Sequence, residues 1–328
     1  MTEGDEGQRT LAAPQDPGKT QNLGARQAAP ACASSTTEPP PYIFALLGLM
    51  VLLWSANFIV AKYALREFSP VMAGALRFTL AGAIIGPMYL WTTRKSPPKQ
   101  WNRRNLTKLL GTGILGVGLN QLFFLMGLEQ TSVGHASLVI ASTPVMVLLL
   151  SAATGHERIT SKKVAGFAVA IGGVIFLQVS PAKSSQASIL GDIFILLACL
   201  AFASFTVFGK TIVSRYDGLT VNTFAYVGSG VILSPITLWY GFQFNFAAVT
   251  WAGWTALLYM AVFPSLLCYM IYYHALHFIP ASRIAALSYL QPFLATLLAI
   301  VLLGEHLTTT LVIGGLLVIT GVLLAERS

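Results

Sequence analysis

The side chains that stand out chemically in this sequence are polar groups isolated within long apolar runs. Three amides, Asn57, Asn120 and Gln121, interrupt such runs. Burying an unpaired amide in a hydrocarbon-like medium costs on the order of 2–7 kcal/mol, so each must bond another helix, water or a ligand. The sequence leaves interhelical bonding and substrate contact equally open for each amide. Together the amides indicate a neutral polar cavity.

Two prolines, Pro144 and Pro292, each fall near the middle of an apolar run. A proline removes one backbone donor and clashes with the carbonyl four residues earlier, so each predicts a bend with polar backbone at mid-membrane depth. The polar neighbours Thr143 and Gln291 favour a lined cavity over the alternative, a pair of packing kinks. Four aromatic residues are candidates for the cavity wall: Trp54, Tyr226, Tyr269 and Tyr273.

Charged residues are nearly absent from the apolar runs, and Arg77 is the exception. It either snorkels to the membrane surface, pairs with Asp192, or meets an anionic group of a substrate. No Asp or Glu falls in the middle of a run, so the sequence identifies no coupling ion; Asp192 and Glu129 are the nearest candidates. Glu157 and Glu305 each precede a Thr by three residues, and we interpret them as helix-start or turn residues.

Several other chemistries lack the residues they need. His274 and His277 share a helix face, but no further metal ligand lies near them, and the three cysteines are far apart. There is no phosphate-binding lysine motif, and Gly228-Ser229-Gly230 is not the spacing of a serine nucleophile. We therefore expect no enzyme activity, no metal site and no cofactor.

The amino-acid composition indicates whether these residues lie in a soluble protein or in a membrane protein. The chain has 328 residues, of which 55% are hydrophobic and 10% charged, with a mean hydropathy of +0.69. A soluble protein carries about 25% charged residues. This composition excludes a cytosolic enzyme, a disordered protein and a secreted disulfide scaffold, and it leaves a polytopic helical membrane protein.

From Tyr42 onward, apolar runs long enough to cross about 30 Å of hydrocarbon follow one another. They are too long for barrel strands, so we expect helices. Residues 1–41, with six prolines and no aromatic residue, are interpreted as a disordered tail. The ten predicted spans are 42–63, 71–91, 107–127, 135–153, 160–179, 189–209, 220–241, 250–273, 281–303 and 308–325.

The distribution of Lys and Arg predicts the orientation of these spans. Sixteen of the 20 lie on the side of the N-terminus and three on the opposite side, which predicts that both termini are cytoplasmic. The basic segment 94–108 with its two tryptophans resembles a nucleic-acid patch in composition. A positive loop beside anionic lipid explains it better, so we expect no nucleic-acid partner.

The two halves of the chain align at a single, constant difference in residue number, which we call the repeat offset. It takes Pro144 to Pro292, and both halves contain the pattern P-x12-E-x2-T-x5-G-x6-G from these prolines onward. Several identities at one offset indicate a duplication. Each half holds five spans, and an odd number inserts the second half upside down, as in many secondary transporters. We predict a first repeat over 42–180 and a second over 181–328; duplication that merely enlarges the bundle is the alternative.

The chain resembles the EamA-like branch of the drug/metabolite transporter superfamily over about 42–325. The resemblance implies ten helices in two inverted five-helix repeats around a central cavity between spans 1–4 and 6–9. It also implies transport of amino acids, other metabolites or drugs, often outward. Gln291 departs from the Glu-Pro common at this position in the family. The segments that carry the resemblance are Trp54-Ser55-Ala56-Asn57-Phe58, Leu76-Arg77-Phe78, Thr143-Pro144-Val145, Gly191-Asp192, Tyr289-Leu290-Gln291-Pro292 and the two Glu-x-x-Thr turns.

The sequence thus predicts an all-α polytopic membrane protein that acts as a secondary transporter. It would export a small metabolite, amino acid or drug by alternating access, with a small molecule and the lipid bilayer as partners. A bacterial inner membrane is the location that the resemblance implies, and a homodimer stays open. The alternative function is a receptor or scaffold that binds a ligand without transporting it.

Overall fold

Apolar helices make up nearly all of the structure, a computed structural model that describes residues 40–94, 102–154, 160–179, 188–213, 216–275, 278–279 and 290–326. These residues all belong to one compact unit, Pro39–Ser328. No strand occurs in these ranges. The predicted disordered tail lies outside them, apart from its last two residues, and so does Glu157.

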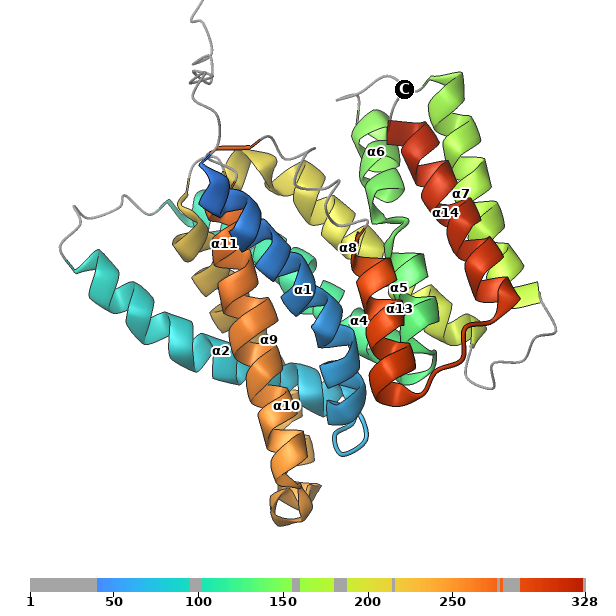
Figure 1. Ribbon diagram of the computed structural model, residues 1–328. Helices are drawn as coiled ribbons and strands as arrows, with labels where there is room; N and C mark the ends of the chain where they lie inside the picture. Colours follow the sequence, from blue (N-terminus) through green and yellow to red (C-terminus); the bar gives the residue numbers. More distant parts are fainter. Residues whose placement is uncertain are drawn as a thin grey trace, which may run out of the picture. The chain divides into compact units, whose positions relative to one another are not determined.

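The helices of this unit are drawn in Figure 1, and they follow the apolar runs of the sequence closely. Their bounds are α1 (Pro41–Ala64), α2 (Pro70–Thr93), α3 (Arg103–Gly113), α4 (Asn120–Glu129), α5 (Val133–Ile140), α6 (Thr143–Ala153), α7 (Ser161–Val179), α8 (Ile189–Val213), α9 (Gly218–Gln243), α10 (Trp251–Val262), α11 (Cys268–Ala275), α13 (Leu290–Leu303) and α14 (Thr309–Glu326). The short 3-10 helix η2 (Phe246–Ala248) precedes α10.

Capping residues explain where several helices begin. The Ser69 hydroxyl accepts a hydrogen bond from Met72 N, and Pro70 takes the first helical position, where its missing N–H costs nothing. Ser132 and Thr250 cap α5 and α10 in the same way. Side-chain oxygens thus satisfy backbone donors that a membrane protein cannot leave unpaired.

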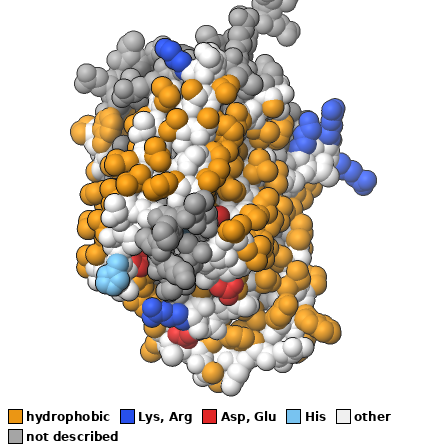
Figure 2. Space-filling model, turned by 90° about the vertical axis from the view of Figure 1, so that its right-hand side faces the viewer, with side chains coloured by type: hydrophobic (Ala, Val, Ile, Leu, Met, Phe, Trp, Pro, Cys, Tyr) orange, Lys and Arg blue, Asp and Glu red, His pale blue; other side chains and the backbone are white. Residues whose placement is uncertain are grey.

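The described helices confirm a polytopic membrane protein. Seven of them, counting α3 to α4, α5 to α6 and α10 to α11 as continuous segments, are long and apolar enough to cross a membrane. Three shorter apolar helices, Val164–Phe176, Leu290–Leu303 and Thr309–Gly321, fall within the fifth, ninth and tenth predicted spans. The number of ten spans stays a prediction. Hydrophobic side chains are spread over the face in Figure 2, and many large apolar residues are exposed, as contact with lipid requires.

Helix boundaries recur at the repeat offset that the sequence predicts. Four helices of the first half, α1, α2, α3 and α7, begin exactly one repeat offset before α8, α9, α10 and α14 respectively. The π-helical segments η1 (Ile114–Leu119) and η3 (Phe263–Leu267) also overlap at this offset. Local helix geometry is therefore shared between the two halves, down to a rare helix type.

Equivalent helices also pack against each other, through small residues. Helices α7 and α14 lie side by side in Figure 1. A Cβ added at Gly173 would lie 2.8 Å from Val318 N, and one added at Gly321 would collide with the backbone of Ala170. The repeat offset takes Gly173 to Gly321 and Ala170 to Val318, so the two contacts are reciprocal. The register also means that the helices run antiparallel.

Two carboxylates cap helices that are distant in the sequence. Glu305 accepts hydrogen bonds from Val133 N (2.8 Å) and Gly134 N (3.1 Å) at the start of α5. Glu305 lies in the turn before α14, as predicted, but it does not start that helix, because Thr308 caps α14. Glu67 accepts hydrogen bonds from the backbone N–H and the hydroxyl of Thr250 at 2.7 and 2.5 Å. Each bond ties a turn to another helix.

Replacing Gly321 by alanine is expected to loosen the α7–α14 contact. The new methyl group would overlap the Ala170 backbone, and overpacking costs about 1–3 kcal/mol. Gly172→Ala is the matched control, because a Cβ there meets nothing within 4 Å. Thermal unfolding in detergent should give a lower midpoint for Gly321→Ala and an unchanged or higher one for Gly172→Ala. Equal midpoints would contradict this packing.

Glu67 is expected to make the stability depend on pH. The Thr250 hydroxyl and backbone N–H hold the pKa of the Glu67 carboxyl below its ordinary value. The folded-state pKa is therefore below the unfolded one. The contribution of Glu67 to the stability of the folded protein is fully present above the unfolded-state pKa, and it is lost as the pH falls through the folded-state pKa. Glu67→Gln should lower the midpoint at neutral pH, and the difference should vanish in acid.

The stabilisation by the Thr250 hydroxyl can be measured separately from that by the Thr250 backbone N–H. Thr250→Val keeps the backbone hydrogen bond to Glu67 and removes the side-chain bond. We expect it to lower the midpoint less than Glu67→Gln does. A difference between Glu67→Gln and the parent that stays constant from neutral to acidic pH would disprove the role of the carboxylate.

Candidate functional site

Arg77 is completely buried, and its guanidinium contacts the hydroxyls of Ser265 and Tyr226. Its Nε donates a hydrogen bond to the Ser265 hydroxyl at 2.8 Å, and that hydroxyl donates to the Met260 carbonyl at 2.7 Å. Two of the predicted alternatives are therefore wrong: the side chain does not snorkel, and it does not pair with Asp192. Asp192 contacts His135 instead.

The charge of Arg77 has no counter-ion in the part of the chain that the structure describes. The groups that act on it electrostatically are the phenols of Tyr226 and Tyr269 and the Cys268 thiol. Its Nη1 atom is buried without a hydrogen-bond partner. Removing a cation from water costs several kcal/mol unless an anion and hydrogen bonds compensate. The site therefore favours an incoming negative group.

Further polar atoms without partners lie on one face of α9. Asn222, Tyr226 and Ser229 are spaced by four and three residues, so they share that face. The Asn222 Oδ1 and the Ser229 hydroxyl are buried and make no hydrogen bond in the described structure, whereas the Tyr226 hydroxyl interacts with Arg77 and Ser265. The Asn222 amide nitrogen donates to the Ser265 carbonyl at 3.2 Å, which brings this face to Arg77. Buried polar atoms without partners require an explanation, and an absent ligand is one.

Aromatic rings line the same region. The Trp54 indole donates a hydrogen bond to the Pro264 carbonyl at 3.3 Å, and its ring meets the edge of Tyr269 at 5.9 Å between centroids. Tyr226 contacts Phe78 at 6.0 Å. We call the group formed by Trp54, Arg77, Asn222, Tyr226, Ser265 and Tyr269 the Arg77 cluster. It joins α1, α2, α9, η3 and α11.

The π-helical segment η3 makes this arrangement possible. Pro264 cannot donate a backbone hydrogen bond, and the widened turn of Phe263–Leu267 accommodates that loss. The Ser265 side chain then faces Arg77, while the carbonyls of Pro264 and Ser265 accept from Trp54 and Asn222. One local deviation from the α-helix therefore supplies three contacts of the cluster.

The predicted amides fall into separate environments. The Asn120 amide donates to the Ala198 carbonyl on α8 at 2.8 Å, and Gln121 donates to Asn120 at 3.2 Å. The Gln121 Oε1 has no partner. Asn57 is buried on α1, one turn beyond Trp54, and its Oδ1 also lacks a partner. Asn120 thus bonds a neighbouring helix, while Asn57 and Gln121 keep one acceptor each for water or a ligand.

The span that contains Pro144 is divided into two helices. Helix α5 ends at Ile140, α6 begins at Thr143, and Pro144 is its second residue. The Thr143 hydroxyl donates to the Ile140 carbonyl across this break. In the other half, Pro292 is buried as the third residue of α13. The part of that predicted span before α13, residues 281–289, lies outside the described ranges. The Gln291 carbonyl accepts a 3.5 Å hydrogen bond from Ser55 on α1.

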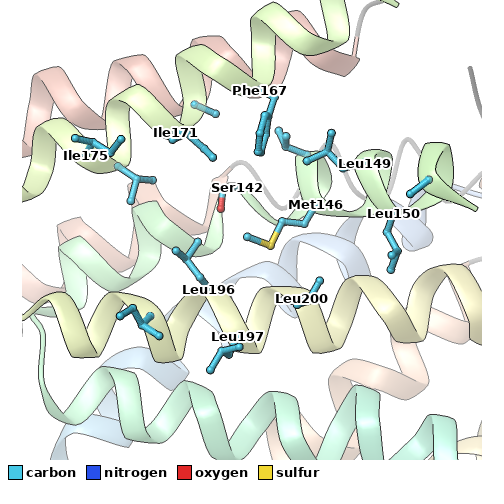
Figure 3. A pocket seen from close by; sticks show the side chains of 15 residues that line it. Ser142, Met146, Leu149, Leu150, Phe167, Ile171, Ile175, Leu196, Leu197 and Leu200 are labelled. Atoms are coloured by element: carbon cyan, nitrogen blue, oxygen red, sulfur yellow. The ribbon is translucent and has the colours of Figure 1, made fainter. Parts of the chain in front are cut away.

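A cavity of about 540 Å³ lies elsewhere in the bundle, between α6, α7 and α8 (Figure 3). Ser142 is the polar residue in its lining, and side chains such as Met146, Phe167 and Leu196 make the rest apolar. It shares no residue with the Arg77 cluster. An apolar lining suits hydrocarbon, whereas a polar metabolite needs convergent polar groups. We therefore regard the Arg77 cluster as the candidate binding site.

Sequence reasoning identified Trp54, Arg77, Tyr226 and Tyr269, which the structure brings together, but it missed their partners. The missed members of the region are Asn222, Ser229, Pro264 and Ser265. Asn222 is an amide in an apolar run, and Pro264-Ser265 interrupts another, so the rules applied elsewhere would have found both. Among the described residues no group of three metal-ligating side chains occurs, and His277 lies outside those residues.

The model of the EamA-like transporter family matches residues 41–179 and 189–326. An uncharacterized transporter of Archaeoglobus fulgidus is 30% identical over 86% of this chain and 98% of its own length. A probable amino-acid metabolite efflux pump of Escherichia coli (strain K12) is 28% identical, over 83% of this chain and 91% of its own.

Two further proteins extend the comparison. A probable terminal-alkyne amino-acid exporter of Streptantibioticus cattleyicolor is 28% identical over 86% of this chain and 92% of its own. A solved crystal structure with a TM-score of 0.60 is 19% identical, and the match covers 88% of this chain and 97% of that one. At that identity the likeness concerns the fold alone.

Proposed function

The chain belongs to the EamA-like transporter family, and on that premise we propose that this membrane transporter exports small amino-acid-like metabolites by alternating access. The observation that carries the choice of substrate is the buried Arg77 without a counter-ion among the described residues. Relatives named an amino-acid metabolite efflux pump and an amino-acid exporter support the same class.

The chemistry of the Arg77 cluster matches both ends of an amino acid. The guanidinium, with its Nη1 free, suits a carboxylate, since a charge-assisted hydrogen bond is stronger than a neutral one. The Asn222 Oδ1 and the Ser229 hydroxyl supply acceptors for an ammonium group. The rings of Trp54 and Tyr269 would contact an apolar side chain.

The remaining predicted residues are proposed to complete the passage. Asn57, Asn120 and Gln121 offer amide groups on α1 and α4, and Pro144 and Pro292 mark the interrupted spans. Thr143 and Gln291 adjoin the same two prolines. These seven residues are proposed as lining of the substrate pathway: Asn57, Asn120, Gln121, Thr143, Pro144, Gln291 and Pro292.

Alternating access is proposed because pairs of contacts are reciprocal between positions related by the repeat offset. Asn120 bonds the Ala198 carbonyl, and the equivalent Cys268 bonds the equivalent Met50 carbonyl at 3.7 Å. Gly82 approaches Val227, and the equivalent Gly230 approaches Phe78 and Thr79. Such reciprocity, with antiparallel helix pairs, supports inverted repeats over 42–180 and 181–328 related by a two-fold axis. One repeat would then rock against the other.

Substrates with and without a carboxylate test this proposal. We expect counterflow of one or more of the twenty common amino acids in proteoliposomes. The decarboxylated amine or the methyl ester of a transported amino acid should compete about 10–100-fold more weakly, because a hydrogen bond to a charged group contributes about 1.5–3 kcal/mol. The parent protein suffices for this measurement, so folding of a variant is not an issue.

Substitution of Arg77 gives a second test. Arg77→Gln should weaken the apparent affinity for the carboxylate by the same factor and abolish the preference over the amine. Arg66→Gln is the control, because Arg66 is an exposed cation on the loop beside α1. An unchanged preference in Arg77→Gln would place the carboxylate elsewhere. Saturable binding of an amino acid without any flux would favour the alternative, a ligand-binding receptor.

We also propose that the protein lies in a bacterial inner membrane with both termini in the cytoplasm, as the distribution of Lys and Arg indicates. In a chain whose three own cysteines are replaced by serine, single cysteines introduced at Ser132 and at Ser161 lie at opposite ends of neighbouring spans. An impermeant thiol reagent should label Ser132→Cys on intact cells and Ser161→Cys only after permeabilisation. The reverse pattern would overturn the orientation. Cross-linking of the same single-cysteine variants would reveal the proposed homodimer.

A further inference from the structure

The turn between α1 and α2 is held by a corner of the other half of the chain. Phe68 is 2% exposed, and its ring meets those of Phe244 and Trp254 at 5.6 and 5.7 Å between centroids. Beside it, the Glu67 carboxylate accepts hydrogen bonds from the backbone N–H and the hydroxyl of Thr250. The turn belongs to the family match at 41–179, and the corner that holds it belongs to the match at 189–326.

A second carboxylate makes the reverse connection at the same end of the bundle. Gly304, with a φ of 67°, turns the chain after α13, and Glu305 then caps α5 in the first match. Lys62, on the last turn of α1, interacts electrostatically with Glu305. The neighbouring Tyr63 hydroxyl donates a hydrogen bond to the Leu302 carbonyl at 3.4 Å, and Figure 1 shows α1 and α13 ending side by side. Both carboxylates therefore lie on the face of the bundle where α1 ends.

The Arg77 cluster lies further along the same helices. Ala73 and Arg77 are four residues apart on one face of α2, and α2 begins just after the turn that contains Glu67. Helix α10 begins after Thr250 and continues into η3, which holds Ser265. The contact of Glu67 with Thr250 and the contact of Arg77 with Ser265 are therefore successive connections between the same two segments. A substrate that moves between Arg77 and this face along these segments passes the first connection.

We propose that Glu67, Phe68 and Glu305 form a gate that closes the substrate pathway on this face. The inference rests on the alternating access proposed above, and it names the contacts that break when the pathway opens here. In the described structure the gate is closed, with Phe68 buried and both carboxylates bonded. A carboxylate and an N–H group that separate at a water-filled opening both become hydrated, so the gate opens at a modest cost in free energy.

The experiment measures access to a reporter cysteine behind the gate. Ala73 is buried between the turn of Glu67 and Arg77, and Ala73→Cys is placed in a chain whose own cysteines are replaced by serine. An impermeant thiol reagent is added on the side from which Ser132→Cys is labelled. We expect Glu67→Gln and Glu305→Gln to raise the labelling rate of the reporter about three- to tenfold, because a charged acceptor makes a stronger hydrogen bond than a neutral one.

Matched variants separate gating from general loosening. Glu129→Gln removes an exposed carboxylate from the same face, at the end of α4, and should leave the labelling rate unchanged. Buried Cys199 on α8, kept as the single cysteine of a second chain, should not become more reactive in Glu67→Gln. If the carboxylate variants do not fold, Gly253→Ala tests the same contact, because its Cβ would lie 2.6 Å from the Glu67 Oε2 and displace it. Gly48→Ala, whose Cβ meets nothing within 4 Å, is the control for that variant.

Locking the gate should give the complementary result. Glu67→Cys combined with Thr250→Cys places two thiols at the contact between the halves. A disulfide between them should abolish counterflow in proteoliposomes, and reduction should restore it. The same oxidant should leave the counterflow of each single variant unchanged.

The outcomes distinguish failure of the gate from failure of the proposed substrate class. Labelling of the reporter at the parent rate in Glu67→Gln and Glu305→Gln overturns the gate, and so does an equal rise in the reactivity of Cys199. Counterflow by the cross-linked protein overturns it as well. Absence of counterflow for every amino acid overturns the proposed substrate class, whereas the labelling rates still decide whether the gate exists.

Discussion

Close approach of equivalent helices is the constraint on which the described structure depends. Lipid offers helices little hydrophobic driving force toward one another, so they associate through van der Waals contact at small residues. Gly173 and Gly321 allow α7 and α14 to meet at backbone distance, and Gly82 and Gly230 face the backbone of the partner helix where α2 and α9 meet. Phe78 and Tyr226, equivalent by the repeat offset, contact each other, as residues near a two-fold axis do.

Polar chemistry departs from this shared scaffold at a few positions. The repeat offset matches Arg77 with Ala225, and it matches Ser265 with Val117. The two π-helical segments are equivalent in geometry, but glycines in η1 admit Phe205 and Ser229, whereas Pro264 and Ser265 in η3 bind Trp54 and Arg77. The two halves therefore share their packing, and the residues of the proposed binding site are among those at which the halves differ.

The sequence predicted the parts of the structure that depend on local pattern. Helix bounds agree within a few residues because apolar run length, Ser or Thr caps and turn residues act over short distances. It predicted four members of the Arg77 cluster because a charge or aromatic ring in an apolar span is conspicuous. It did not predict the contacts of Glu305 with α5, or of His135 with Asp192. Those partners are 172 and 57 residues apart, and one sequence gives no register between helices that distant.

The Arg77 cluster and the His135–Asp192 pair share one structural property: each contains a contact between the first and the second matched segment of the chain. Arg77 on α2 bonds Ser265 in η3, and His135 on α5 bonds Asp192 on α8. Each contact therefore connects a helix of residues 41–179 to a segment of residues 189–326. A movement of one segment against the other would stretch or close both contacts at once, without any direct path between them. A substrate bound at Arg77 would then bias an equilibrium that also opens or closes the contact between α5 and α8, and this effect would follow from its differential binding to the two states.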